Sequence, residues 1–288
     1  MRSKLFVPGA RPELFAKALA GDADALSFDL EDSVPETRKA EARADVAEFL
    51  RSPAMRAAAK VIVVRLNALD TPHFEADVQA VTQSAVALLN LPKVESAEDI
   101  RAAVAVLERV EAASGIDRSI RLLATIETPR GLRRAAEIAG AHPRVAGLQL
   151  GLADLFQPFG IDRGDPANVH ATLYAMRMAA AEAGVFAWDA AFADLEDAEG
   201  FRAEASMARR LGYVGKSCIH PSQVALANEA FQPDVEEIAV ARRIVAAARE
   251  AGAAGRGAFL VDGRMVDLPF LKRAEAILAS VDADTSKP

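Results

Sequence analysis

Two carboxylates near the middle of the chain follow apolar segments that predict neighbouring strands. Glu127 comes directly after Leu122–Ile126, and Asp154 lies in the turn after Val145–Leu150, with no cysteine or histidine beside either acid. The pair therefore offers only hard oxygen ligands. Mg2+ is typically held by one or two protein carboxylates, while waters or substrate oxygens complete its coordination. This pattern predicts an Mg2+ site, although two acids that cap helices would look the same in sequence.

A second group of charged side chains follows three earlier predicted strands. Its members are Asp29, Glu31, Asp32, Arg65 and Lys93. Three acids within four positions predict a site that organises a cation or a cationic side chain. The planar guanidinium of Arg65 suits two-point binding of a carboxylate, so Arg65 is expected to bind an acidic substrate, to pair with Glu31 or Asp32, or to do both. Lys93 is expected either to hold an internal acid or to bind an anionic substrate.

The elements that would position these side chains are short apolar runs that alternate with helical patterns. The runs are Leu5–Pro8, Ala25–Leu30, Val61–Leu66, Ala87–Leu91, Leu122–Ile126, Val145–Leu150, Val185–Trp188 and Gly215–Ile219. Continuous apolarity is typical of strands that are buried on both faces of a parallel sheet. Among the expected helices, Ser96–Ala113 opens with Ser96 and Asp99 at the spacing of a capping box, and Gly131–Ile138 is another. Eight strand–helix units predict a (β/α)8 TIM barrel, with an open doubly wound sheet as the alternative. In a barrel the C-terminal ends of the strands share one mouth, where the charged side chains would meet.

The C-terminal part of the chain lies outside these eight units. Gly252–Gly257 is a break rich in glycine and alanine, Asp262-Gly263 predicts a hairpin turn between apolar stretches, and Phe270–Ser280 predicts a last helix. The sequence therefore predicts a barrel domain over 1–252 and a hairpin–helix extension over 253–288. We expect this extension to act as a cap or as an arm exchanged between copies of the chain.

Composition limits the class of protein. The 288 residues carry a formal net charge of −7, which argues against general binding of nucleic-acid backbones. One cysteine, Cys218, excludes an internal disulfide and a multi-cysteine zinc site. No apolar run approaches the roughly 20 residues of a membrane span, and the N-terminus turns polar too early for a signal peptide. We therefore expect a cytoplasmic protein without a membrane partner.

Seven motifs, taken together and in this order, resemble those of a known enzyme family. They are Arg2–Gly9, Asp29–Val34, Val64–Asn67, Leu91–Lys93, Ile126–Pro129, Gly151–Asp154 and Gly215–Pro221. The series resembles the citrate lyase β-subunit-like family of the HpcH/HpaI aldolase superfamily, which includes malyl-CoA and citramalyl-CoA lyases. The resemblance implies a TIM barrel, a trimer or hexamer, Mg2+ held by Glu127 and Asp154, and an oxo acid bound by Arg65.

The resemblance also gives the extension a role. Met265–Pro269 matches a segment that carries a catalytic aspartate into the site of a neighbouring subunit, which implies this role for Asp267. The implied reaction is cleavage of a 3-hydroxyacyl-CoA to an acyl-CoA and a 2-oxo acid, or the reverse condensation. Mg2+ would act as a Lewis acid, Arg65 would stabilise the alkoxide or carboxylate, and Asp267 would return a proton to the thioester enolate.

The expected contacts follow from this assignment. The substrate-binding residues are expected to be Arg65, Glu31, Asp32, Lys93, Gly151 and His220, and the CoA-binding residues Lys4, Phe6 and Ile219. His220 alternatively hydrogen-bonds a neighbouring loop. Two other functions stay open: a metal-dependent aldolase for free pyruvate and an aldehyde, and a lyase subunit that acts on acyl-carrier-protein thioesters. The Met265–Pro269 segment argues against the aldolase. The sequence does not identify the acyl group.

Overall fold

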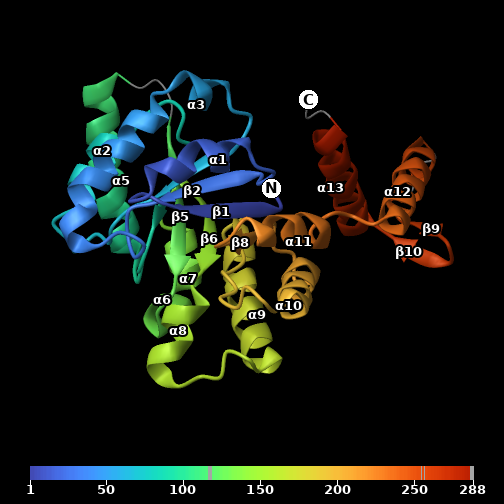
Figure 1. Ribbon diagram of the computed structural model, residues 1–288. Coiled ribbons are helices and arrows are strands. Elements are labelled where there is room, and N and C mark those ends of the chain that lie inside the picture. Colours follow the sequence, from blue (N-terminus) through green and yellow to red (C-terminus); the bar gives the residue numbers. More distant parts are fainter. Residues whose placement is uncertain (116–118, 254, 256, 286–288) are drawn as a thin grey trace. The chain divides into compact units, whose positions relative to one another are not determined.

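The computed structural model describes residues 1–115, 119–253, 255 and 257–285. The chain divides into two compact units, Met1–Phe231 and Gln232–Pro288. Strands lie at the centre of the first unit in Figure 1. Among the described residues of this unit, eight strands form one sheet. They are β1 (Ser3–Pro8), β2 (Ala25–Asp29), β3 (Val61–Arg65), β4 (Leu88–Leu91), β5 (Arg121–Ile126), β6 (Val145–Leu150), β7 (Phe186–Trp188) and β8 (Lys216–Cys218).

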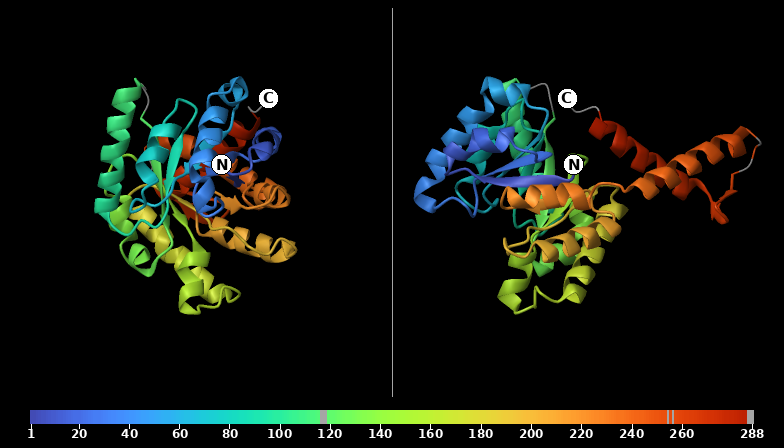
Figure 2. Two further views of the ribbon diagram at one scale, coloured as in Figure 1. Left: turned by 60° about the vertical axis from the view of Figure 1, so that its left-hand side comes forward. Right: turned by 45° about the vertical axis from the view of Figure 1, so that its right-hand side comes forward.

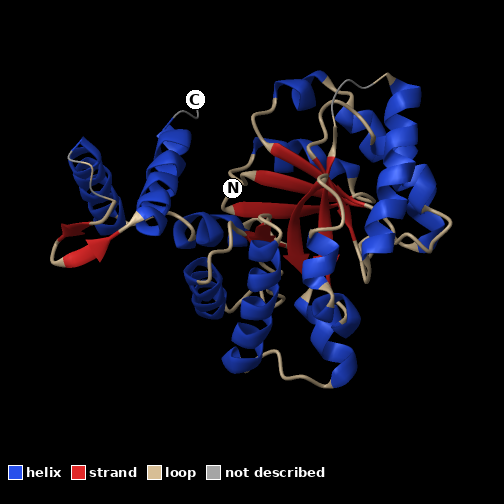
Figure 3. Cartoon of the chain, turned by 180° about the vertical axis from the view of Figure 1, so that it is seen from behind, coloured by secondary structure: helices blue, strands red, loops and turns tan. Residues whose placement is uncertain are grey.

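Helices connect these strands and surround them (Figures 2 and 3). The α-helices are α1 (Phe15–Ala20), α2 (Lys39–Leu50), α3 (Pro53–Ala57), α4 (Phe74–Val81), α5 (Ala97–Ser114), α6 (Pro129–Arg133), α7 (Ala135–Ala139), α8 (Leu152–Phe156), α9 (Pro166–Glu182), α10 (Ala198–Arg210) and α11 (Ser222–Ala230). The short 3-10 helices among the described residues are η1 (Pro12–Leu14), η2 (Glu36–Arg38) and η3 (Gln157–Phe159).

The strands are parallel and follow the order β7-β6-β5-β4-β3-β2-β1-β8. The two ends of this order meet just beyond β7, because the Asp189 N–H donates to the Gly215 carbonyl at 3.0 Å and the Ser217 N–H donates to the Asp189 carbonyl at 3.2 Å. The sheet therefore closes on itself, which confirms the (β/α)8 barrel and excludes the open doubly wound sheet.

The strands are largely buried because helices cover their outer face and their inner face lines the barrel interior. Most buried apolar side chains form one extended cluster, and a small separate cluster joins Val63, Leu88 and Ala146. Other buried positions on the strands are polar. The side chain of Lys4 on β1 donates a hydrogen bond to the side chain of Gln149 on β6. These strands are not neighbours in the sheet, so this contact crosses the barrel interior.

Local sequence signals explain two helices of the barrel. Ser96 and Asp99 form the predicted capping box at the start of α5, because the Asp99 N–H donates to Ser96 Oγ at 3.2 Å and the Ser96 N–H donates to Asp99 Oδ2 at 2.9 Å. The single helix predicted over Gly131–Ile138 is wrong in detail. Two short helices, α6 and α7, meet there at Arg134, whose φ of −105° and ψ of 13° lie outside the helical range.

The second unit contains α12 (Val235–Ala253), β9 (Phe259–Val261), β10 (Arg264–Val266) and α13 (Leu268–Thr285). β9 and β10 form the predicted hairpin, whose turn residues Asp262 and Gly263 have φ values of 51° and 77°. Because α12 packs against α13 and β9, it belongs to this unit, and the division at Phe231 precedes the boundary predicted at 252. No helix among the described residues is long and apolar enough to cross a membrane.

Candidate active site

Arg65 is the centre of the charged cluster at the C-terminal ends of the strands. Its Nε and Nη2 each lie 2.7 Å from one carboxylate oxygen of Asp29, so the two side chains form a two-point ion pair. Burial disfavours ionisation of Asp29, but the Arg65 guanidinium outweighs this effect and holds the pKa of Asp29 below its usual value. The sequence prediction named Asp29 only as one of three acids and missed it as the principal partner. The sequence feature that could have revealed this pair is that Asp29 and Arg65 stand at the ends of consecutive strands, which pair in register.

The third guanidinium nitrogen of Arg65 contacts the two other acids of this segment. Nη1 lies 2.9 Å from Glu31 Oε2 and 3.2 Å from Asp32 Oδ2. Glu31 is buried, whereas Asp32 is exposed. The structure therefore contains the predicted pairs of Arg65 with Glu31 and with Asp32, in addition to the pair with Asp29.

Lys93 follows β4 and extends the cluster toward β5. Its Nζ lies 3.0 Å from Glu31 Oε1 and 4.0 Å from Asp32 Oδ1. The Lys93 main-chain N–H donates to Glu127 Oε1 at 2.6 Å. Lys93 was expected either to hold an internal acid or to bind an anionic substrate, and in the structure it contacts internal acids. A cavity of about 370 Å³ adjoins Glu31, Asp32 and Lys93 and extends to His73.

Glu127 is a buried carboxyl group in an acidic setting. Only 3% of the residue is exposed. Burial is the main cause that raises its pKa to about 8, and the negative charges of Glu31 and Asp154 raise it further. Gly151 makes room for this side chain, since a Cβ atom built at Gly151 would lie 2.6 Å from both Cβ and Oε2 of Glu127. The glycine thus allows the main chain at Gly151 to approach Glu127 closely.

Asp154 lies in the first turn of α8 and is exposed. Its charge acts on Glu127, so the structure brings the two predicted metal ligands into one electrostatic environment. No three histidine, cysteine, aspartate or glutamate side chains among the described residues gather as a metal-binding group. A pair of acids fits Mg2+ without a third ligand, because this ion commonly keeps waters or substrate oxygens. A dication would also stabilise the ionised form of Glu127, which burial disfavours.

The expected CoA-binding residues differ in their surroundings. Lys4 is fully buried, and its Nζ lies 4.8 Å from the centre of the Phe6 ring, while Arg65 Cζ lies 5.1 Å from the same ring centre. Burial, and then the charge of Arg65, lower the pKa of Lys4. The amine of Lys4 is enclosed in the barrel, where it bonds to Gln149, and a role of Lys4 as a wall of the CoA pocket stays a prediction. Ile219, in contrast, is 43% exposed.

His220 follows β8 and makes local hydrogen bonds. Its Nδ1 lies 2.8 Å from Ser222 Oγ and accepts a hydrogen bond from the Ser222 N–H at 3.2 Å. The ring is exposed. The structure thus contains the alternative hydrogen bonding of His220 to its own loop, and the ring is still accessible.

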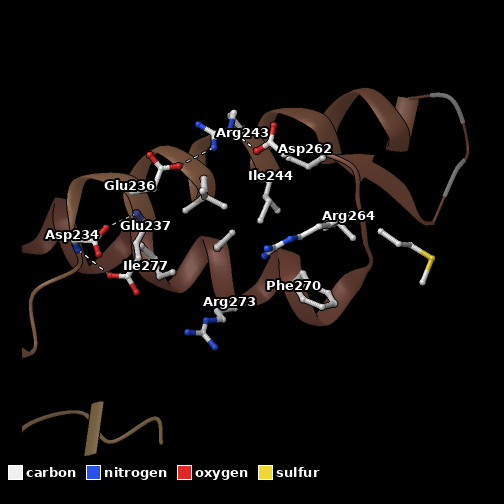
Figure 4. Close-up of a pocket in the computed structure, with 16 residues that line it drawn as sticks. Asp234, Glu236, Glu237, Arg243, Ile244, Asp262, Arg264, Phe270, Arg273 and Ile277 are labelled. Atoms are coloured by element: carbon white, nitrogen blue, oxygen red, sulfur yellow. Dashed lines mark hydrogen bonds and ion pairs between the residues drawn. The ribbon is translucent and has the colours of Figure 1, made fainter. Parts of the chain in front are cut away.

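Asp267 belongs to the second unit, between β10 and α13. Its carbonyl accepts the Leu271 N–H at 3.1 Å, and its Oδ1 is buried with no hydrogen-bond partner among the described residues. Met265 and Leu268, on either side of it, are 68% and 58% exposed. The same unit holds a cavity of about 670 Å³ between α12, α13 and the hairpin, which Arg264 and Phe270 line (Figure 4).

Known proteins are similar to this chain over most of its length. The family model described as HpcH/HpaI aldolase/citrate lyase matches residues 2–221. An L-malyl-CoA/beta-methylmalyl-CoA lyase of Cereibacter sphaeroides is 36% identical over 98% of this chain and 94% of the relative. A (3S)-malyl-CoA thioesterase of the same species is 35% identical over 98% and 95%.

A solved structure is similar over almost the whole chain. It is the CitE protein of Mycobacterium tuberculosis in complex with magnesium, acetoacetate and coenzyme A, with a TM-score of 0.75 and 35% identity over 96% of this chain and 97% of that one. This likeness confirms the barrel fold independently of the sheet order, and the matches together confirm the resemblance that the seven motifs carry.

Proposed function

This chain belongs to the HpcH/HpaI aldolase/citrate lyase family, and on that premise we propose that it is an Mg2+-dependent carbon–carbon lyase for 3-hydroxyacyl-CoA thioesters. The observation that carries the proposal is the buried Glu127 carboxyl group, set among other acids at the mouth of the barrel. The similarity to a malyl-CoA lyase and to a structure that holds magnesium and coenzyme A supports the choice of ion and substrate class.

Glu127 and Asp154 are the proposed ligands of Mg2+. When bound, the ion supplies positive charge to the carboxylate and carbonyl oxygens of the oxo acid. Lys93 and Gly151 hold the Glu127 side chain in place, one by a hydrogen bond and the other by leaving space. The exposed Asp154 completes the pair from α8.

Arg65 is the proposed binding residue for the substrate carboxylate or alkoxide. Asp29 occupies its Nε and Nη2, so the Nη1 edge is the one that a substrate can reach. The exposed Asp32 is the weaker partner there, at 3.2 Å, and a substrate carboxylate can replace it. Asp29 and Glu31 then keep the guanidinium fixed while the outer partner exchanges.

Asp267 is the proposed acid–base residue, supplied by a neighbouring copy of the chain. During cleavage its carboxyl group would give a proton to the carbon of the acyl-CoA enolate, and in condensation its carboxylate would take that proton back. We therefore propose a homo-oligomer, a trimer or hexamer, in which the extension of one copy completes the site of a neighbouring copy. We also propose that this enzyme works in the cytoplasm. The exposed Met265 and Leu268 beside Asp267 support a role for this segment in contact with another copy.

The test is an assay of both products from L-malyl-CoA, with citramalyl-CoA and citryl-CoA as alternatives. A lyase releases an acyl-CoA and a 2-oxo acid, and EDTA should abolish their formation. Free CoA thiol without any oxo acid would instead indicate thioester hydrolysis, as in the thioesterase relative. Cleavage that EDTA leaves unchanged would refute the role of Mg2+. Turnover of free pyruvate with an aldehyde, or of acyl-carrier-protein thioesters alone, would favour one of the two other functions.

Sharing of sites between copies has its own test. Asp267→Asn should abolish turnover and leave Mg2+ affinity unchanged. Mixing Asp267→Asn with Arg65→Ala protomers should restore part of the activity, because some sites would then combine an intact barrel with an intact extension. Subunit exchange without any recovery would contradict the sharing of sites.

A further inference from the structure

Lys93 contacts two different acids of the site with two different groups. Its main-chain N–H donates to Glu127 Oε1 at 2.6 Å. Its side-chain ammonium lies 3.0 Å from Glu31 Oε1, with Asp32 Oδ1 at 4.0 Å. One residue thus joins the acid that follows β5 to the acids that follow β2. These acids repel one another, and the charge of Glu31 acts directly on Glu127.

The backbone of Lys93 has an unusual conformation. Its φ is +53°, in the left-handed region that residues with a side chain rarely adopt. Among the described residues other than glycine, only Asp262 in the hairpin turn shares a positive φ. Such a conformation persists where surrounding contacts enforce it. Here it accompanies a short hydrogen bond to a buried carboxyl group at the proposed metal site.

We propose that Lys93 is a positioning residue that sets the spacing between Glu127 and Glu31, through its left-handed main-chain N–H on one side and its ammonium on the other. It acts on the reaction through these two acids and does not bind the substrate. This inference rests on the proposed role of Glu127 as a ligand of Mg2+. It goes beyond that role because it separates a backbone contribution from a side-chain contribution.

The backbone contribution can be isolated with three variants that all lose the ammonium. Lys93→Gly, Lys93→Met and Lys93→Val have the same charge but differ in how readily they adopt a positive φ: glycine does so freely, whereas a β-branched residue resists it. All three retain a main-chain N–H. Titration calorimetry with MgCl2 alone should give an affinity for Lys93→Val about tenfold weaker than for Lys93→Gly. Equal affinities of these two variants would overturn the backbone part of the proposal.

Thermal unfolding of each variant checks that the barrel is intact. If Lys93→Val does not fold, the comparison passes to Lys93→Gly and Lys93→Met. The glycine variant should then bind Mg2+ severalfold more tightly than the methionine variant, and an equal or weaker affinity would overturn the proposal.

The side-chain contribution is tested by kinetics with L-malyl-CoA. Lys93→Met keeps the aliphatic stem and removes the charge, so kcat should fall about tenfold or more while KM changes little, because the acids lose their spacing. Lys93→Arg restores the positive charge and should recover most of kcat. A higher KM with unchanged kcat in Lys93→Met would show that Lys93 binds the substrate, which would overturn the proposal.

Glu127→Gln separates failure of this inference from failure of the proposed function. If Glu127→Gln binds Mg2+ as the parent protein does, the metal site itself is wrongly placed. If Glu127→Gln weakens Mg2+ binding but none of the Lys93 variants changes affinity or kcat, the metal site stands and the positioning role of Lys93 is refuted.

Discussion

Replacing Gly151 with alanine would place a methyl group in space that the Glu127 side chain occupies. The new Cβ would lie 2.6 Å from Glu127 Cβ and 2.6 Å from Glu127 Oε2. Carbon atoms in contact normally stay about 3.5–4.0 Å apart, so the two side chains must separate by about 1 Å. Rotation of the carboxylate alone does not relieve the overlap, because the Cβ of Glu127 is one of the two atoms involved.

The expected loss follows from this displacement. A misplacement of about 1 Å in a catalytic arrangement costs about a hundredfold in rate, which corresponds to about 2.7 kcal/mol at 1.36 kcal/mol for each factor of ten. Gly151→Ala should therefore lower kcat/KM about a hundredfold and weaken Mg2+ binding. Overpacking of this kind also lowers the free energy of unfolding by about 1–3 kcal/mol.

The assay compares Gly151→Ala with Gly140→Ala as a matched control. Gly140 has a φ of −87°, and the nearest atom to its built Cβ is the Ala136 carbonyl oxygen at 3.5 Å, an ordinary contact. The control should keep the parent kcat/KM and Mg2+ affinity. If Gly151→Ala also keeps both values while its fold is intact, then Glu127 is not held where the structure places it, and the reasoning about the metal site fails.

Three further predictions concern ionisation and charge. Burial raises the pKa of Glu127 from an ordinary value near 4.5 to about 8, so between these pH values the native state binds a proton that the unfolded state has lost. The metal-free protein should therefore lose stability as the pH rises from about 4.5 to 8. Glu127→Gln should flatten this pH dependence of the free energy of unfolding in denaturant titrations. Burial raises the pKa of the Cys218 thiol to about 12. The thiol should therefore resist iodoacetamide at pH 8 in the native protein and react once urea unfolds the chain. Fast labelling of the native protein would contradict the burial of Cys218. Arg65→Lys keeps the charge but loses the two-point pair with Asp29, so kcat/KM should fall at least tenfold, and an unchanged value would show that the guanidinium geometry is not needed.

The sequence predicted the barrel well because each strand is marked by its own composition. A run such as Leu122–Ile126 is buried on both faces and is apolar except for Thr125, and β5 indeed covers Arg121–Ile126. Capping and turn residues also act locally, which explains why the Ser96–Asp99 box and the Asp262-Gly263 turn were predicted correctly.

Contacts between distant segments were harder to predict. The amine of Lys4 donates a hydrogen bond to Gln149 on a strand that is not its neighbour, and nothing in the sequence around Lys4 predicts that partner. The pair of Asp29 with Arg65 depends on the register of β2 and β3, which single-sequence patterns leave open. The left-handed backbone at Lys93 likewise arises from the contacts around it, since lysine has no preference for a positive φ.

Trp188 gives the barrel an optical label of its own. It is the single tryptophan of the chain, it is fully buried in β7, and Lys4 Nζ lies 5.3 Å from the centre of its ring. Both tyrosines, Tyr174 and Tyr213, also precede Gln232. Indole fluorescence of the unmodified protein therefore reports melting of residues 1–231 alone, whereas far-ultraviolet circular dichroism sees the helices of both units. Overlaying the two melting curves would reveal whether the arm that carries Asp267 melts together with the barrel or separately from it.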